Sequence, residues 1–588
     1  MTHDLSSLPR RRALPIRALC AAGVLMTPAV TRAADEAPSP NATENLVRLM
    51  VKQKLLTAEQ ADGLIAQARA EAEQARTATT KPADSKPAEA PKPNGETPPK
   101  DGVVRVQYVP ESVKQQLRDD IRQELAQQAL EEGWAKPGTV PEWTKKFHPS
   151  GDFRLRFDGR YYPDGNNLTG AFPNFNAINT GVPYDVSQSN PNFAPQLNAD
   201  ETRERVRVRA RIGTDIDLGE NFSSGFRIAT GDTASPISQN QTFGQAGGFT
   251  KYALWVDRMF LKFQPTLGDD RELMLELGRF DNPFFGSHLM WAEDLGFDGF
   301  AAKFVYNKKG KVTPFVTVGA FPVGSNALDF STLQPDKQPS VDKWLYAAQL
   351  GATVKTVKDV TFKVAGAYYQ FDNVSGKLST PFTPLSQLDE GDTDNTRPTF
   401  ANVGNTYMAL RNILPDAGNN FGNTNQWQYF GLAPEYRVVA LTARADISTF
   451  DPFHVWLDGE VIKNIAFDRG RVSRLAVNNR AGGSSTGGYE GGDLGWEINL
   501  HVGKPVFEKR WDWAVGVGYR HQESDSTLDA FNDNDFGNGG TNLEGYTLYG
   551  SLALSKNVWV RARWFSAENI GGPTFRADTL QLDIGARF

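Results

Sequence analysis

Apolar and charged side chains alternate residue by residue in several stretches between residue 150 and the C-terminus. The stretch from Arg203 to Ile212 reads RERVRVRARI, and the stretch from Thr579 to the end reads TLQLDIGARF. Since successive side chains of a β-strand point to opposite faces, each stretch makes a strand with one apolar and one polar face. A soluble sheet with one buried face would also alternate, but these polar faces are densely charged. The lengths of the connections between the strands distinguish a soluble sheet from a transmembrane barrel.

Short turns and long polar connections alternate along the same region. In outer-membrane barrels, short turns lie on one side of the membrane and long loops on the other. We therefore predict an all-β fold, a closed antiparallel transmembrane β-barrel over residues 150–588. The expected turns are 217–221, 307–311, 356–359, 504–509 and 555–557, and the expected long loops are 163–200, 231–250, 324–343, 372–425, 465–492 and 524–543.

About sixteen strands are predicted, to within two. A closed bacterial barrel needs an even number, because an open edge would expose unpaired backbone amides to lipid. A barrel of this size encloses water rather than a core of side chains. The predicted strands are 151–162, 202–217, 222–230, 251–263, 272–280, 298–307, 312–321, 344–355, 360–371, 428–449, 453–463, 493–503, 511–522, 545–554, 558–567 and 578–588. The side chains predicted to face lipid are Phe153, Leu155, Phe157, Val206, Val208, Leu580, Leu582 and Ile584.

The composition of the chain excludes several other classes of protein. Hydrophobic residues make up 39% of the chain and the mean hydropathy is −0.45. No run of 18 apolar residues occurs, so no transmembrane helix is expected. An aromatic content of 11% argues against a chain that is disordered throughout. The single cysteine, Cys20, excludes a disulfide framework and a four-cysteine zinc site.

Residues 1–34 have the pattern of a secretory signal peptide. Four arginines between positions 10 and 17 precede a short apolar stretch at 18–26, and the TRA sequence at 31–33 offers small residues for cleavage. Cleavage would remove five basic residues and one acidic residue, which takes the formal net charge from −6 to about −10. An exported chain this acidic is not expected to bind nucleic acid.

Three further segments lie between the signal peptide and the barrel, and together they form an arm expected in the periplasm. Residues 35–76 show apolar residues at helical spacing and a capping box, which predict a helical hairpin. Residues 77–102 are rich in Pro, Ala and Lys and predict a disordered linker. Residues 103–149 include a charged amphipathic segment, which is either a short coiled coil or a helix packed on another element.

The last predicted strand ends the chain on an aromatic residue, Phe588. An alternating terminal strand with this ending resembles the signal that the outer-membrane barrel-assembly machinery recognises. The expected partners are therefore outer-membrane lipid and that machinery.

Several stretches of the chain are distinctive. They are VVRVQYVPE at 103–111, GRFDNPFF at 278–285, DTDNTRP at 392–398 with GNTYMALR at 404–411, and LDAFND at 528–533 with GGTN at 539–542. The chain resembles in these stretches a proteobacterial family called "putative porins". The resemblance implies an outer-membrane channel for passive diffusion of small hydrophilic solutes or ions, without a known solute, cofactor or catalytic residue. By similarity to general porins, a homotrimer is expected, with a monomer as the alternative.

An arginine ladder is the main chemical feature of the predicted barrel. An arginine that faced lipid at the membrane midplane would cost about 2–4 kcal/mol, so we expect the ladder to face the lumen. There it would line the pore and attract anions. The alternative is that Asp152, Asp158 and acidic loops pair with these charges. The candidate pore-lining arginines are Arg154, Arg156 and Arg160 on the first strand and Arg203, Arg205, Arg207, Arg209 and Arg211 on the second.

Acidic residues that follow the GRFDNPFF stretch are candidates for the opposite side of a pore constriction. They are Glu293, Asp294 and Asp298. The residues FF at 284–285 and LMW at 289–291 could pack such a loop against the barrel interior. The alternative is an ordinary outer loop with surface acids.

Two acidic segments, DEGDTDN at 389–395 and DND at 533–535, have oxygen ligands that suit calcium, but neither fits a twelve-residue calcium loop. We expect solvated loops there and no metal or cofactor. An outer-membrane hydrolase is disfavoured, because the exported part has five histidines without a nucleophile motif or metal spacing. A second alternative is a structural envelope protein whose helical arm tethers the outer membrane to the cell wall.

Overall fold

The computed structural model describes residues 142–168, 170–231, 235–326, 340–356 and 359–588. The predicted signal peptide, helical hairpin and linker, and most of the segment 103–149, lie outside these residues and stay predictions. The described part begins with a short 3-10 helix, η1 (Glu142–Lys146). The first strand starts directly after it, three residues before the predicted barrel boundary.

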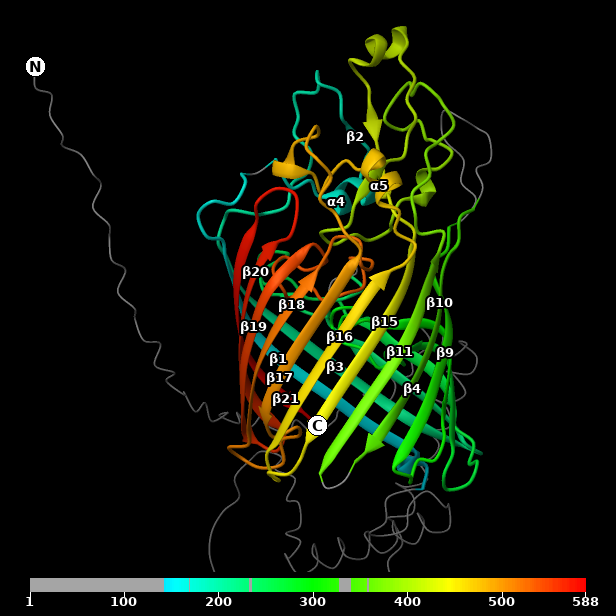
Figure 1. The fold of residues 1–588 in the computed structure, drawn as a ribbon, viewed down its shortest axis with the longest axis vertical. Coiled ribbons are helices and arrows are strands. Elements are labelled where there is room, and N and C mark those ends of the chain that lie inside the picture. The colour runs from blue at the N-terminus through cyan, green and yellow to red at the C-terminus, as the bar shows by residue number, and fades with distance from the viewer. Residues whose placement is uncertain (1–141, 169, 232–234, 327–339, 357–358) are drawn as a thin grey trace, which may run out of the picture. The chain divides into compact units, whose positions relative to one another are not determined.

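Sixteen long strands form a closed antiparallel ring (Figure 1), which confirms the predicted fold class and strand number. Strands that follow one another along the ring pair side by side, and the first strand pairs with both the second and the last. One further strand in the sheet, β5 (Gln241–Thr242), is a two-residue strand beside the second long strand. The sixteen are β1 (Phe147–Tyr161), β3 (Arg203–Gly219), β4 (Phe222–Ala229), β6 (Trp255–Phe263), β7 (Glu272–Phe280), β8 (Phe297–Val305), β9 (Val312–Gly324), β10 (Lys343–Lys355), β11 (Val360–Asp372), β15 (Tyr436–Ile447), β16 (His454–Asn464), β17 (Leu494–Gly503), β18 (Trp513–Gln522), β19 (Leu543–Ser555), β20 (Val558–Asn569) and β21 (Arg576–Arg587).

The strands differ from the predicted ranges chiefly at one place. A single strand was predicted over 428–449, but the barrel strand β15 begins only at Tyr436. Pro434 lies just before it, and a proline cannot donate a ladder hydrogen bond within a central strand. The residues before Pro434 instead form β13 (Trp427–Gln428) and β14 (Phe430–Leu432), which pair with the loop strands β2 (Tyr184–Asp185) and β12 (Tyr407–Ala409).

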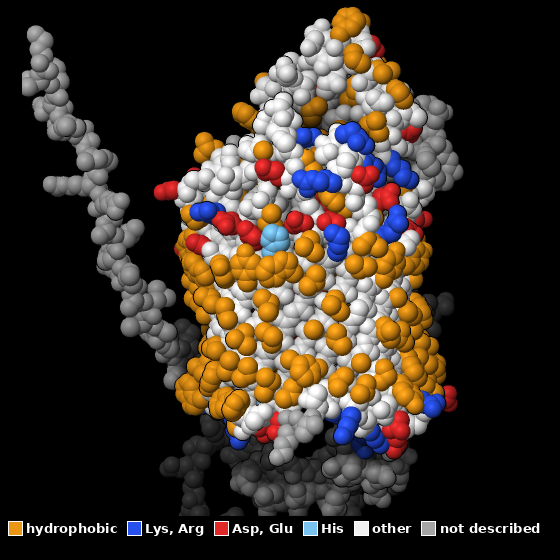
Figure 2. Space-filling model, viewed as in Figure 1, with side chains coloured by type: hydrophobic (Ala, Val, Ile, Leu, Met, Phe, Trp, Pro, Cys, Tyr) orange, Lys and Arg blue, Asp and Glu red, His pale blue; other side chains and the backbone are white. Residues whose placement is uncertain are grey.

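The outer face of the barrel is apolar and the inner face is polar. In β21, Ile584 is 50% exposed, whereas its inward neighbours Gln581 and Asp583 are buried. Figure 2 shows hydrophobic side chains forming a band around the barrel, with charged side chains above and below it. Val208 is the exception among the predicted outward residues, because it is only 8% exposed and is flanked by Leu155 of β1 and Gln241 of β5. An apolar band of this kind is the surface that a lipid bilayer requires.

Short turns and long loops lie at opposite ends of the barrel (Figure 1). Only Glu220 and Asn221 separate β3 from β4, and both have positive φ angles, as a tight hairpin turn requires. At the other end, the loops carry small elements: α4 (Phe175–Thr180), η2 (Asp394–Thr396), η3 (Ala417–Gly422), α5 (Arg469–Leu475) and η4 (Ala481–Gly483). Among the residues that the structure describes, no helix has the length and apolar character to cross a membrane.

Candidate functional site

The connection between β7 and β8, residues 281–296, folds into the barrel, and we call it the inner loop. Polar side chains on the inner face of the barrel wall form hydrogen bonds with the backbone of this loop and with the hydroxyl of Ser287. Gln349 of β10 accepts a hydrogen bond from the N–H of Phe285 at 2.8 Å and donates one to its carbonyl at 2.7 Å. The Oγ of Ser287 donates to Glu460 of β16 at 2.6 Å. Gln522 of β18 donates to the carbonyl of Leu289 at 3.0 Å. These contacts hold the inner loop against strands well removed from β7 and β8.

Apolar side chains of the inner loop pack against the inner face of the wall. Leu289, Met290 and Trp291 are buried. The Trp291 ring lies 5.2 Å from the ring of Tyr369 in β11 and 5.0 Å from that of Phe297 in β8, in edge-to-face geometry. Inward alanines on β10, β11 and β15 leave the space that these large side chains fill: Ala347, Ala367 and Ala440.

The opposite wall carries the arginine ladder, and most of its members are paired with acids. Arg156 is fully buried between Asp583 of β21, at 2.7 Å, and Asp535, at 2.9 Å. Asp158 binds the neighbouring ladder members Arg205, at 2.9 Å, and Arg207, at 3.4 Å. A buried charge without a partner of opposite charge is strongly destabilising in a low-dielectric interior. Burial of the ladder arginines therefore requires these ion pairs.

The part of the ladder nearer the short-turn end shares a second acid. Asp152 binds both Arg209, at 3.2 Å, and Arg211. The structure therefore places five of the predicted arginines in ion pairs, as the alternative interpretation of the ladder expected: Arg156, Arg205, Arg207, Arg209 and Arg211.

Three predicted arginines have no carboxylate at ion-pair distance within the described part of the chain. The Nη2 of Arg154 donates to Asn240 at 2.7 Å, and its buried Nε has no hydrogen-bond partner. Arg160 donates to Asn538 and to the carbonyl of Asn534. Arg203, at the end of β3, is exposed.

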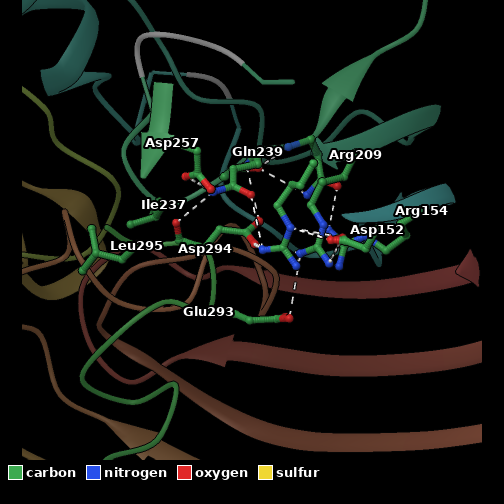
Figure 3. Close-up of polar contacts among 12 residues, drawn as sticks. Asp152, Arg154, Arg209, Ile237, Gln239, Asp257, Glu293, Asp294 and Leu295 are labelled. Carbon is green, nitrogen blue, oxygen red and sulfur yellow. Dashed lines mark hydrogen bonds and ion pairs between the residues drawn. The ribbon is translucent and has the colours of Figure 1, made fainter. Parts of the chain in front are cut away.

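Two of the three predicted acids lie opposite this wall (Figure 3). Oδ1 of Asp294 lies 2.7 Å from Nη1 of Arg209, and Asp294 is only 6% exposed. Glu293 is 57% exposed to the lumen, 3.8 Å from Arg209. The protein around this half-exposed carboxylate removes part of its hydration, which raises its pKa, but the positive charges of Arg209, His288 and Arg154 outweigh that effect and lower the pKa to about 2.

The third predicted acid, Asp298, is not part of this arrangement. Strand β8 begins at Phe297, so Asp298 is a strand residue rather than a loop residue. Phe297 packs in the core cluster, and the alternation of a strand turns the next side chain to the other face. There Asp298 binds Arg279 of β7 at 2.7 Å.

A cavity of about 640 Å³ lies between the inner loop and the wall and extends to the short-turn end of the barrel. Of the eight predicted arginines, it is lined by Arg154 alone, and it also contacts Glu293 and Asp294. Sequence reasoning missed Arg561 and Arg563 of β20, which line it as well. The signal was present, because the stretch VWVRARWF at 558–565 alternates and places both arginines on one face.

A second cavity of about 530 Å³ lies on the long-loop side, and Asp294 lines both cavities. Two other loop segments meet the inner loop near this junction. Gln239 donates its backbone N–H to Asp294 at 3.3 Å, as Figure 3 shows. From the loop between β18 and β19, Phe531 accepts a hydrogen bond from the N–H of Ala292 at 2.8 Å, and Asp533 donates its N–H to His288 at 3.2 Å. The partition between the two cavities is thus built from three loops.

The acidic segments considered for calcium are held by arginines in this structure. Asp394 binds Arg411, Asp533 binds Arg520 and Asp535 binds Arg156. Within the described residues, no group of three or more His, Cys, Asp or Glu side chains is arranged to hold a metal ion.

Three histidines of the barrel strands contact acids, and one of them, His501, also lies 2.7 Å from the hydroxyl of Tyr549. His454 binds Asp446, His501 binds Asp458 and His521 binds Glu544. Ser287 precedes His288 in the chain, but its hydroxyl donates to Glu460.

Comparison with known proteins identifies a family. The family model described as "Putative porin" matches residues 40–588. A comparison with curated proteins gave no match.

Several solved structures match most of the length of this chain. OprB of Pseudomonas putida is 14% identical, with a TM-score of 0.39, over 77% of this chain and 97% of that one. The outer membrane channel DcaP of Acinetobacter baumannii is 10% identical, with a TM-score of 0.35, over 76% and 98%. OmpF of Salmonella typhi is 11% identical, with a TM-score of 0.31, over 75% and 97%. Since these TM-scores lie below 0.5, the fold assignment stands on the strand pairing of the chain itself.

Proposed function

The chain belongs to the "Putative porin" family and is an outer-membrane porin, and we propose that solutes cross it through the space between the inner loop and the arginine wall. Passive diffusion of small hydrophilic solutes needs a water-filled passage through a closed barrel. The two cavities lie on either side of the loop partition and Asp294 lines both, so we place the path across the partition beside this residue.

The observation that carries this proposal is the opposition of charges across the junction. Glu293 and Asp294 lie on the inner loop, and Arg154 and Arg209 lie on the wall (Figure 3). Acids on one side and bases on the other create a transverse field, which orients water and favours small polar solutes over apolar ones. Since Asp294 is paired and Arg154 is not, the local balance favours anions.

We further propose an orientation and partners for the barrel. Strand β1, the first strand of the barrel, begins at the short-turn end, and outer-membrane barrels keep short turns in the periplasm. The helical arm would then lie in the periplasm, where it could contact the cell wall. The assembly machinery would recognise β21 and its terminal Phe588, and a homotrimer is the expected assembly.

The test is the current through the exported protein in a planar bilayer. A diffusion pore gives current steps that rise in proportion to the KCl concentration, with a reversal potential that shows weak anion preference in a salt gradient. The proposal would be contradicted if protein that is folded as a barrel, and that unfolds on heating, gave no such current steps. Cross-linking in detergent separately tests whether the assembly is a trimer or a monomer.

A further inference from the structure

Among the described residues, three guanidinium groups in the larger cavity lack an acidic partner, those of Arg154, Arg561 and Arg587. Arg587, at the end of β21, is exposed and donates to the carbonyl of Phe507 at 3.4 Å, so Arg154 and Arg561 are the two that lie less exposed to bulk water. Arg154 donates only to Asn240, at 2.7 Å, and Arg561 donates only to Ser551 of β19, at 2.9 Å. Both side chains line the cavity. Their positive charges are therefore not neutralised by the barrel wall.

Other arginines of the same cavity are paired. Arg444 binds Asp458 at 3.3 Å, Arg520 binds Glu497 at 3.0 Å, and Arg563 binds Asp535 at 3.4 Å. Because unpaired charges in a partly dehydrated interior are costly, they are uncommon and point to a ligand of opposite charge.

Aromatic side chains adjoin the unpaired arginines. The guanidinium of Arg561 lies 6.0 Å from the ring of Tyr549, whose hydroxyl is fixed by His501 at 2.7 Å. Trp559 precedes Arg561 by two residues on β20, so both side chains are on the inner face of that strand, and Trp559 also lines the cavity. Planar rings beside a guanidinium accept a flat, apolar group that carries a carboxylate.

We propose that this cavity is a binding site for small aryl carboxylates that pass through the pore. The carboxylate of the solute pairs with Arg561 and Arg154, and its ring lies against Tyr549 and Trp559. A volume of about 640 Å³ suits a solute of this size. The negative charge of Glu293 in the same cavity disfavours dianions, and the surrounding arginines repel amines. This inference rests on the proposed pore function and adds a solute class to it.

The test measures block of the KCl current by sodium benzoate in the purified full-length exported protein. Benzoate is expected to reduce the current in a saturable way, while benzamide, which lacks the charge, does not. Acetate, which lacks the ring, is expected to need a higher concentration. Arg561→Gln should raise the benzoate concentration for half-block about tenfold, because it removes a charge-assisted hydrogen bond. Arg154→Gln, on a different strand, should act in the same direction.

The matched control is Arg271→Gln. Arg271 lies in the turn before β7, is exposed, and contacts only the ring of Tyr306 at 5.7 Å. Its loss removes one positive charge outside the cavity and should leave the half-block concentration unchanged. Equal benzoate block in wild type, Arg561→Gln and Arg154→Gln would overturn the site, as would equal block by benzamide. If either result is found while the KCl current is normal, the binding site is refuted and the pore function is still supported. If the wild-type protein conducts no KCl current at all, the pore function itself is refuted.

Discussion

Asp294 of the inner loop and Arg209 of β3, 85 residues apart in the chain, form a 2.7 Å ion pair inside the barrel. Both side chains are largely buried, and the other carboxylate oxygen of Asp294 accepts the N–H of Gln239. One carboxylate therefore ties the inner loop to the wall and to a second inward segment, at the junction of the two cavities. A residue in this position should affect both the width of the passage and its charge.

Replacement of this carboxylate by an amide is the first prediction. Asp294→Asn leaves Arg209 with Asp152 as its near acidic partner, at 3.2 Å. We expect the reversal potential in a KCl gradient to move toward anion selectivity and the current noise to increase, since the inner loop loses an anchor. Asp298→Asn is the matched control, because it also replaces one acid by an amide, but at a strand residue that lines neither cavity. Equal shifts in the two variants would contradict the assigned role of Asp294.

Loss of the hydroxyl anchor of the inner loop is the second prediction. Ser287→Ala removes the 2.6 Å hydrogen bond to Glu460 and leaves that buried carboxyl with Thr442 as its side-chain partner. We expect a loss of stability of about 1–3 kcal/mol, measured as a lower unfolding temperature of the barrel in detergent. Ser448→Ala removes a comparable bond in an exposed turn and should have a much smaller effect.

The pH dependence of pore selectivity is the third prediction. Neighbouring positive charges lower the pKa of Glu293 to about 2. Its carboxylate therefore stays ionised at pH values well below those at which glutamate usually takes up a proton. A lowered pKa in the folded state gives stability that is present above pH 4.5 and is lost as the pH falls toward 2. The contribution of Glu293 to selectivity, taken as the difference in reversal potential between wild type and Glu293→Gln, should stay constant from pH 7 to about pH 4. A difference that falls by half near pH 4.5 would show that Glu293 titrates as an ordinary glutamate.

The fourth prediction concerns the loop between β18 and β19, where Asp529 is buried. Burial raises its pKa to about 7, although hydrogen bonds from the backbone of Asn402 and Asn405 act in the opposite direction. A raised pKa means that the folded state holds its proton more tightly than the unfolded state, so local stability falls as the pH rises from about 4 to 7. Amide exchange in this loop, corrected for the intrinsic rate, should show less protection at pH 8 than at pH 5. Asp529→Asn should remove most of that difference.

The barrel could be predicted from the sequence because its pattern is local. Alternation over ten residues is enough to define a strand such as β21, and short connections such as Glu220-Asn221 force neighbouring strands to pair. The start of β15 could not be placed so well, because a strand and an apolar loop segment near Pro434 look alike in sequence.

The partners of the charged residues depend on contacts between distant segments and could not be predicted in the same way. Arg156 meets Asp583 only because the ring closes, and it meets Asp535 only because a long loop folds inward. Arg561 is far from the ladder in sequence, yet closure brings β20 within two strands of β1. No local sequence pattern shows which arginines will form ion pairs with acids and which will not.

The most direct test of the central claim uses a single cysteine at the tip of the inner loop. The only native cysteine, Cys20, lies in the predicted signal peptide, so Glu293→Cys gives an exported protein with one thiol. If solutes pass between the inner loop and the arginine wall, a bulky charged methanethiosulfonate reagent should reduce the single-channel current in discrete steps, and a thiol reductant should restore it. An unchanged current from protein whose modification at position 293 is complete by mass spectrometry would contradict the account.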